Sequence, residues 1–441
     1  MIDVLVTGRS LPALQVALDC AEVGLQVALL THPSTQHRPD TPERDPEGVI
    51  AAFIERTLQP LDGHSTRLEG SETRSVPVRK VTETAPSTPL LRDRNGEWAA
   101  QPHPNVFGVP AVVLSAETLS LLGTGAALRA YLDRITPLLT VGKTRTLGEL
   151  VQKRLGPELL RKLVQPQVFQ RFGRSTDQVD VAIAAPGLNE ALSRTGALSS
   201  AVLAYSDRHV KRETGVAPAT GWGDFTQQLL RKLDLYGVDM LDQKLQRIER
   251  EADTWVSVLT DGTRVQSRAI VVDHASEPLP IETQAEWISG VLPQFVRMHA
   301  ETDMQPSQSL PSLNVALSTE GEWALEIHTS ETGSARAHLS SVTAPTGTLR
   351  PEQAADAFAQ FSVEPSSDDG VLVWLTAAPF SSLAERDTAM QLLDDFVEHT
   401  PTMLPVGRVF HGDQLDQALE WSHVEAVKLR RKLLGIDGDP E

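Results

Sequence analysis

The sequence predicts an α/β protein that begins with a strand–helix–strand unit. Three stretches support this prediction: an apolar run at Val4–Thr7, an amphipathic stretch at Leu14–Glu22, and a second apolar run at Val27–Leu30. Short apolar runs on either side of a helical pattern are typical of a βαβ unit in a parallel sheet. Gly24 lies where a glycine commonly ends a helix. We therefore expect residues 2–31 to form a strand, a helix and a second strand.

The turn between the first strand and the helix carries a reduced dinucleotide-binding fingerprint. In the intact fingerprint, three glycines allow a tight turn, close approach to a pyrophosphate, and packing of helix on strand. Here Gly8 holds the first position, Ser10 the second and Ala13 the third, where alanine is allowed. The helix N-terminus would face the phosphates with free N–H groups, and Arg9 would add a phosphate contact. Pro12 is expected in the first helical turn, where its missing N–H is tolerated.

The end of the second strand lacks the acidic residue that normally binds the ribose hydroxyls. Thr31 stands there, followed by His32. A threonine hydroxyl binds one ribose hydroxyl but does not accept two hydrogen bonds as a carboxylate does. Losing one charge-assisted hydrogen bond costs about 1.5–3 kcal/mol. A plain βαβ unit that binds no nucleotide therefore stays open as an alternative.

The composition limits the classes of protein and of partner. The chain has 441 residues, which suggests two or three domains. Its 58 acidic and 40 basic side chains give a net charge of −18, which argues against a nucleic-acid partner. No apolar run approaches the ~20 residues of a membrane-spanning helix. We expect a cytoplasmic protein that acts on a small molecule, and contact with a membrane surface stays open.

The sequence marks no catalytic side chain. The single cysteine, Cys20, excludes an intrachain disulfide and a cysteine metal cluster. It falls on the first expected helix, where a buried apolar role is expected. There is no His/Glu metal spacing, no nucleophile elbow and no paired-carboxylate signature, so no metal site is predicted.

Beyond the first unit, strand and helix patterns alternate along the chain. Residues 31–48 and 82–89 are expected to be loops, and Asn95–Gly96 predicts a hairpin turn between Leu91 and Trp98. The expected helices are Glu47–Leu61, Leu119–Ile135, Leu147–Leu155, Glu158–Val164, Leu188–Leu192, Ala197–Ala204, Pro351–Phe361, Leu383–Val397 and Leu415–Leu434. The expected later strands are a meander that starts at Gly237–Met240 and continues through Leu245–Ile248, Trp255–Leu259 and Ala269–Val272, then Phe295–His299, Leu313–Ala316, Trp323–Thr329 and Val371–Thr376.

An ordered set of short motifs runs along the chain. The motifs are Arg92–Gly96, Phe107–Pro110, Leu147–Leu150, Arg154–Glu158, Leu163–Pro166, Phe172–Gly173, Ala185–Leu188, Gly196–Leu198, Ala217–Gly223 and Gly412–Asp413. Each motif alone is unspecific. Their order and spacing together resemble the FAD-dependent protoporphyrinogen and coproporphyrinogen oxidases, which belong to the flavin amine-oxidase-like superfamily.

This resemblance implies an α/β protein with a Rossmann-like FAD/NAD(P)-binding domain, a mixed-sheet substrate domain and a helical subdomain. The expected ranges are 1–60, 214–285 and 400–441 for the dinucleotide domain, 61–112 and 286–399 for the substrate domain, and 113–213 for the helical subdomain.

The resemblance also implies a place for each part of FAD. The pyrophosphate would lie at the turn from Gly8 to Ala13 and the ribose beside Thr31. The adenine would pair with the backbone of Leu245, and the ribityl-phosphate arm would lie against Gly412 and Asp413. Asp413 has an alternative role as a turn or helix-capping residue.

Two bulky residues near the C-terminus depart from the family pattern. Gln417 and Trp421 stand where the family has Gly-Ala and Ser-Gly pairs that let the backbone approach the flavin. Together with the changes at Ser10 and Thr31, they predict weakened FAD binding.

The function implied by the resemblance is dehydrogenation of a porphyrinogen-like substrate by hydride transfer to FAD, with oxygen as a candidate acceptor. Two alternatives stay open. A cofactor-poor relative would bind a tetrapyrrole or a partner protein. Another flavoenzyme of the superfamily would act as an amine oxidase or a carotenoid desaturase.

Overall fold

The computed structural model describes residues 2–31, 41–59, 80–84, 89–136, 145–274, 296–304, 315–318, 322–329, 335–343, 351–363 and 371–436. The chain forms two compact units. Unit 1 combines Met1–Pro86, Lys211–Val291 and Gln391–Glu441, and unit 2 combines Ser87–Val210 and Leu292–Met390. His32 and residues 60 and 61 of the expected second helix lie outside the described residues.

A seven-stranded sheet forms the centre of unit 1. Its order is β10-β2-β1-β13-β12-β11, with β19 also paired to β13. The strands are β1 (Ile2–Val6), β2 (Val27–Leu30), β10 (Asp239–Leu241), β11 (Leu245–Glu251), β12 (Thr254–Leu259), β13 (Arg264–Asp273) and β19 (Met403–Val406). β1 runs parallel to both β2 and β13, with Val4 opposite Val27 and Ala269. The predicted strand–helix–strand unit is confirmed, with α1 (Leu11–Ala21) between the strands and Pro12 in its first turn.

The predicted meander is correct for three strands and wrong for the first. β11, β12 and β13 pair in antiparallel order. β10 instead lies parallel to β2, with Asp239 opposite Ala28. The reason is that β10 follows a helix, α11 (Gly221–Leu235), and a helical crossover returns the chain to a parallel position.

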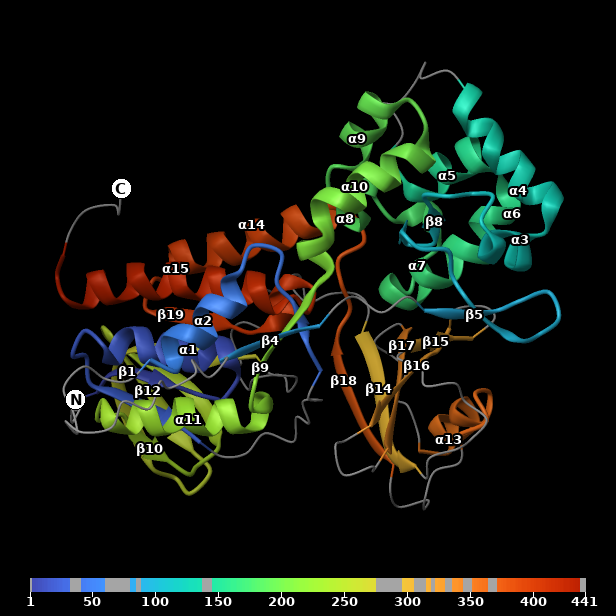
Figure 1. Ribbon diagram of the computed structural model, residues 1–441. Coiled ribbons are helices and arrows are strands. Elements are labelled where there is room, and N and C mark those ends of the chain that lie inside the picture. Colours follow the sequence, from blue (N-terminus) through green and yellow to red (C-terminus); the bar gives the residue numbers. More distant parts are fainter. Residues whose placement is uncertain are drawn as a thin grey trace, which may run out of the picture. The chain divides into compact units, whose positions relative to one another are not determined.

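Apolar residues on both faces of this sheet form the core of unit 1. On one face Val4, Val6 and Val271 pack with α1, α11, α2 (Val49–Thr57) and α15 (Leu415–Leu433). α1 and α15 lie side by side (Figure 1), and His423 of α15 lies 2.8 Å from the Asp19 carboxylate of α1. On the other face Leu5 and Ile270 pack with Trp255. The sheet is therefore covered where β1 and β13 meet.

A second, three-stranded sheet in unit 1 corrects parts of the two predicted loops, of which residues 32–40 and 85–88 lie outside the described residues. β9 (Gly215–Pro218) pairs with β3 (Glu43–Arg44) on one side and β4 (Val81–Thr84) on the other. β4 is polar and exposed over most of its length, so no apolar alternation marks it. Its strand conformation comes from backbone pairing with a distant segment.

Unit 2 contains a mixed seven-stranded sheet in the order β18-β14-β17-β16-β15-β5-β6. The strands are β5 (Leu90–Arg92), β6 (Trp98–Ala100), β14 (Val296–Met304), β15 (Val315–Leu317), β16 (Ala324–Thr329), β17 (Ala335–Thr343) and β18 (Leu372–Ala377). The predicted hairpin is confirmed, because β5 pairs with β6 and Gly96 turns the chain with φ 83°. The inner strand β17 was not expected, although helix α13 (Pro351–Ala359) was.

Short helices build the rest of unit 2. They are α3 (Ala116–Leu122), α4 (Thr124–Tyr131), α5 (Leu147–Leu155), α6 (Pro157–Leu159), α7 (Gln165–Phe172), α8 (Val181–Ala184) and α9 (Leu188–Thr195), with α10 (Leu198–Glu213) and α14 (Leu383–His399) extending into unit 1. The predicted single helix from Leu119 to Ile135 is wrong, because Gly123 has φ 83° and separates α3 from α4. Leu160–Val164 is a π-helical turn, and Leu132–Ile135 is a 3₁₀ turn.

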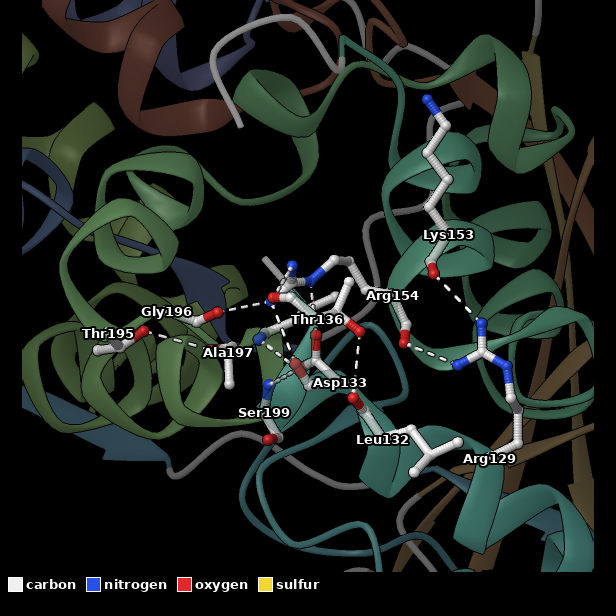
Figure 2. A network of polar contacts seen from close by, with 11 residues as sticks. Arg129, Leu132, Asp133, Thr136, Lys153, Arg154, Thr195, Gly196, Ala197 and Ser199 are labelled. Carbon is white, nitrogen blue, oxygen red and sulfur yellow. Dashed lines mark hydrogen bonds and ion pairs between the residues drawn. The ribbon is translucent and has the colours of Figure 1, made fainter. Parts of the chain in front are cut away.

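A buried ion pair links these helices, as Figure 2 shows. Arg154 Nε lies 2.5 Å from Asp133 Oδ1. Asp133 Oδ2 accepts hydrogen bonds from the amides of Leu198 and Ser199 at the start of α10. Arg154 Nη2 donates to the carbonyl oxygen of Gly196 at 2.6 Å. The pair therefore satisfies the free N–H groups of one helix and joins three segments of the chain.

Candidate dinucleotide site

Ser10 caps the first helix. Its Oγ accepts a hydrogen bond from the amide of Ala13 at 3.4 Å, and its carbonyl accepts one from the amide of Leu14 at 2.9 Å. Serine is a preferred N-cap because its oxygen satisfies one of the free N–H groups. Ser10 therefore stands in the fingerprint as a capping residue, and its side chain takes one donor that a phosphate would use.

Asp273 lies against the Gly8–Ala13 turn, which is the loop from the end of β1 to the first turn of α1. The amide of Ser10 donates to Asp273 Oδ2 at 2.8 Å. The amide of Asp273 donates to Thr7 Oγ1 at 3.1 Å. A Cβ atom at Gly8 would lie 2.4 Å from Asp273 Oδ2, so the glycine makes room for this carboxylate.

The Asp273 carboxyl group is buried and only partly satisfied. Burial raises its pKa to about 6, and its hydrogen bonds with Ser10 act in the opposite direction. Asp273 Oδ1 has no hydrogen-bond partner among the described residues. The group sits at the positive end of α1, where an anion is stabilised. The N-terminus of α1 therefore already has an anionic hydrogen-bond acceptor from the same chain.

Asp273 belongs to none of the sequence motifs described above. The residue ends the apolar run Ala269–Val272, and the relevant signal is its position at the carboxyl end of a strand. Because β13 runs parallel to β1, the carboxyl ends of both strands meet at one edge of the sheet. The pairing of the two strands is needed to see this, and it joins distant parts of the sequence.

Arg9 and Thr31 lie close to each other, at the ends of β1 and β2. Arg9 Nη1 lies 3.5 Å from the carbonyl oxygen of Thr31, a long contact. The amide of Thr31 donates to the carbonyl of Leu241 in β10 at 2.8 Å. Thr31 is therefore fixed at the end of β2.

Gly412 and Asp413 form a turn before α15 that is held by an arginine. Both have left-handed backbones, with φ 58° and 60°. Arg408 Nε lies 2.9 Å from Asp413 Oδ1, and Arg408 Nη1 donates to Glu43 Oε1 at 2.6 Å. Burial alone would lower the pKa of Arg408, but the Asp413 and Glu43 carboxylates outweigh it and raise the pKa. Asp413 lies in this turn, and Gln414 holds the N-cap position. The contact of Gly412 and Asp413 with a ribityl-phosphate arm stays a prediction.

The remaining predicted positions have partners within unit 1. Leu245 is buried in β11 opposite Leu259, beside a register shift. Its contact with adenine stays a prediction. Gln417 Nε2 donates to Gln414 Oε1 at 2.6 Å. The half-buried indole of Trp421 donates to Asp394 Oδ1 at 3.3 Å.

The donors of the turn do not fit a pyrophosphate while Asp273 is charged. The amide of Ser10 donates to Asp273, the amide of Ala13 donates to Ser10 Oγ, and Pro12 has no N–H. Two like charges about 4 Å apart repel by about 4 kcal/mol at an effective dielectric constant of ~20. The backbone is that of a dinucleotide turn, but the charge beside it is of the wrong sign.

Unit 2 holds a buried aromatic cluster that sequence analysis missed. The rings of His299, His338 and Trp374 stack, with the His299 and Trp374 centroids 5.0 Å apart. His299 Nδ1 and His338 Nε2 are 3.0 Å apart and share one hydrogen bond. These residues come from β14, β17 and β18, so the register of three strands brings them together.

The described residues hold neither a cluster of metal-ligating side chains nor a helix that could span a membrane. Within the described ranges, no group of three His, Cys, Asp or Glu side chains has the arrangement of a metal site. None of the described helices is both long and apolar enough to span a membrane.

Comparisons with known proteins show the fold. No protein-family model and no curated protein matches the chain. A provisionally named protoporphyrinogen oxidase from Exiguobacterium sp. 255-15 is similar, with 15% identity, a TM-score of 0.72, and 98% of this chain and 99% of that chain covered.

Two further solved structures match over most of their length. Reduced UDP-galactopyranose mutase has 10% identity and a TM-score of 0.62, with 100% of this chain and 95% of that chain covered. Cyclohexylamine oxidase from Brevibacterium oxydans IH-35A has 13% identity and a TM-score of 0.53, with 98% and 99% covered. The chain therefore shares the fold of these solved structures, which confirms the predicted α/β fold class.

Proposed function

We propose that the protein is an FAD-dependent oxidoreductase that binds its cofactor weakly and dehydrogenates a porphyrinogen-like small molecule. The observation that carries the proposal is the Gly8–Ala13 turn, which brings the N-terminus of α1 to the carboxyl end of β1. In parallel sheets this edge is where nucleotides bind. The similarity to the provisionally named protoporphyrinogen oxidase supports this choice of substrate class.

Weak binding follows from the residues around the turn. Asp273 already accepts a hydrogen bond from the amide of Ser10, Ser10 Oγ accepts one from the amide of Ala13, and Thr31 replaces the ribose carboxylate. Gly8, Ser10 and Ala13 would hold the pyrophosphate once the Asp273 carboxyl group is neutral, with Arg9 beside it. The acidic net charge of −18 supports a small-molecule partner over a nucleic acid. We further propose a cytoplasmic location.

One observation favours a second candidate function. The Asp273 carboxylate accepts the hydrogen bond of the Ser10 amide, so the start of α1 has an acceptor from the chain itself without a nucleotide. A relative without cofactor would then bind a tetrapyrrole or a partner protein through the rest of the fold.

A spectrum of the purified protein separates the two candidates. The enzyme should show a flavin absorption band, at least after incubation with excess FAD, and should turn a non-fluorescent porphyrinogen into a fluorescent porphyrin. Protein that stays colourless with excess FAD and leaves the porphyrinogen unchanged would support the cofactor-free candidate. Flavin reduction by an amine or a carotene precursor, and not by a porphyrinogen, would point to another enzyme of the superfamily.

A further inference from the structure

We propose that Asp273 is a built-in anion of the Gly8–Ala13 turn, and that this chain binds the pyrophosphate of a dinucleotide only when the Asp273 carboxyl group has lost its charge. The identity of the dinucleotide as FAD rests on the proposed function. The competition between the carboxylate and a phosphate does not, because it follows from the turn alone.

The first step is the position of the carboxylate. It approaches Gly8 so closely that an added Cβ atom would lie 2.4 Å from Oδ2. In a dinucleotide turn, the first glycine permits the tight turn, the second lets the backbone approach the pyrophosphate, and the pyrophosphate accepts from N–H groups of the helix. Here the space beside Gly8 holds Asp273 Oδ2, which accepts the 2.8 Å hydrogen bond from the amide of Ser10 at the second position.

The second step is that few N–H groups at the start of α1 are left for a phosphate. Ser10 donates to Asp273, Ala13 donates to Ser10 Oγ, and Pro12 has no N–H, which leaves the amide of Leu11 among these four residues. A phosphate must therefore displace the carboxylate to gain the amide of Ser10. Asp273 Oδ1 is buried without a partner in the described part of the chain, so the carboxylate is held by few contacts.

The third step is the charge around Asp273. The titratable groups on the neighbouring elements are Arg9 in the turn, His274 next in sequence, and the set Arg408, His411, Asp413 and Glu43 around the Gly412 turn. Arg9 is directed to the Thr31 carbonyl, and Arg408 is paired with Glu43 and Asp413. Burial lowers the pKa of both His274 and His411 to about 4, so both are neutral near pH 7.

A proton is the simplest way to remove the conflict. Burial raises the pKa of Asp273 to about 6, so the neutral form is accessible at mildly acidic pH. If only that form accepts a pyrophosphate, affinity falls by about tenfold for each pH unit above about 6. Dinucleotide binding would then take up one proton.

The test measures FAD binding by calorimetry at about pH 5.5 and about pH 8. The variants are Asp273→Asn, which keeps the size, and Asp273→Ser, which also removes bulk. Asp3→Asn is the matched control, because it removes the same charge at the opposite end of β1, where Asp3 pairs with Arg268. Circular dichroism confirms that each variant is folded.

We expect the original protein to bind FAD at least tenfold more tightly at the lower pH. Asp273→Asn or Asp273→Ser should bind at least tenfold more tightly than the original protein at the higher pH, and with little pH dependence. Asp3→Asn should behave like the original protein. Equal affinity of the original protein and both Asp273 variants at the higher pH would overturn the proposal.

The same variants separate this inference from the proposed function. If an Asp273 variant binds FAD tightly but leaves porphyrinogens unchanged, the inference stands and the proposed substrate is wrong. If no variant binds FAD but Asp273→Asn binds NADH or ADP-ribose more tightly, the inference again stands and the cofactor is wrong. If none of these ligands binds to any variant at either pH, the inference itself is wrong.

Discussion

Asp133 and Arg154 form a buried ion pair in unit 2, with the carboxylate fully shielded and the guanidinium 7% exposed. Burial raises the pKa of Asp133, and Arg154 and the amides of α10 act against this. The pair joins α5 to the start of α10. Its two members therefore depend on each other more than surface ions do.

We predict that Arg154→Met destabilises unit 2 by about 3–5 kcal/mol, because it leaves a buried carboxylate without its partner. Urea unfolding measures the loss. Arg161→Met is the matched control, since Arg161 pairs with Glu158 at 65% exposure and should contribute less than about 1 kcal/mol. Equal losses in the two variants would contradict a structural role for the buried pair.

Stability should depend on pH through Asp273. Its pKa rises from 3.8 to about 6 on folding, so the folded state binds the proton more tightly than the unfolded state. The neutral carboxyl group stabilises the folded state fully below about pH 3.8, the unfolded pKa, and this stabilisation is lost as the pH rises to about 6. At about 1.4 kcal/mol per pKa unit, the loss is about 3 kcal/mol. Relative to the original protein, Asp273→Asn should gain about this much stability between about pH 4 and about pH 8, as measured by denaturant unfolding.

The Asp3 carboxylate should make the free energy of unfolding depend on pH in the opposite direction, and it therefore serves as a control. Burial would raise its pKa, but hydrogen bonds from Gln26 and Arg268 lower it overall. Its contribution is therefore present above the unfolded pKa and disappears as pH falls. Asp3→Asn should lose stability at neutral pH, and a gain there would contradict this assignment.

Gly8→Ala should destabilise unit 1 by about 1–3 kcal/mol, the usual range for overpacking. The cause is the added Cβ atom, which would lie 2.4 Å from Asp273 Oδ2. The double variant Gly8→Ala/Asp273→Ser should recover most of the loss, because serine is shorter. Additive losses in this double-mutant cycle would show that Asp273 is not the obstacle.

Cys20 should not react with thiol reagents in the folded protein. Its side chain is fully buried in α1, and burial raises the pKa of the thiol to about 12. The thiolate is the reactive form, so a chromogenic disulfide at about pH 8 should label Cys20 only after denaturant is added. Labelling at the same rate without denaturant would contradict the packing of α1 described above.

Local signals explain what the sequence predicted well. Val4–Val6, Pro12 and the apolar face of α1 define the first βαβ unit within 30 residues, and α5 has the predicted bounds Leu147–Leu155. Pairing between distant segments explains the errors. β17 (Ala335–Thr343) is rich in small and polar residues, yet it is an inner strand with a neighbour on each side.

The candidate site follows the same division. Gly8, Ser10 and Ala13 could be found because they are neighbours in the sequence. Asp273 could not, because its role depends on the parallel register of β1 and β13. Arg408 and Glu43 likewise meet from segments far apart in the chain.

The placement of α15 against α1 has a consequence while the protein is being made. All residues of α1 are buried in the finished unit, but β13 begins at residue 264 and α15 at residue 415. At roughly 5–20 residues per second, the ribosome completes β13 about 13–50 s and α15 about 20–80 s after α1 has been synthesised. During that interval the side of α1 that packs against α15 has no permanent cover, so we expect it to be accessible to chaperones.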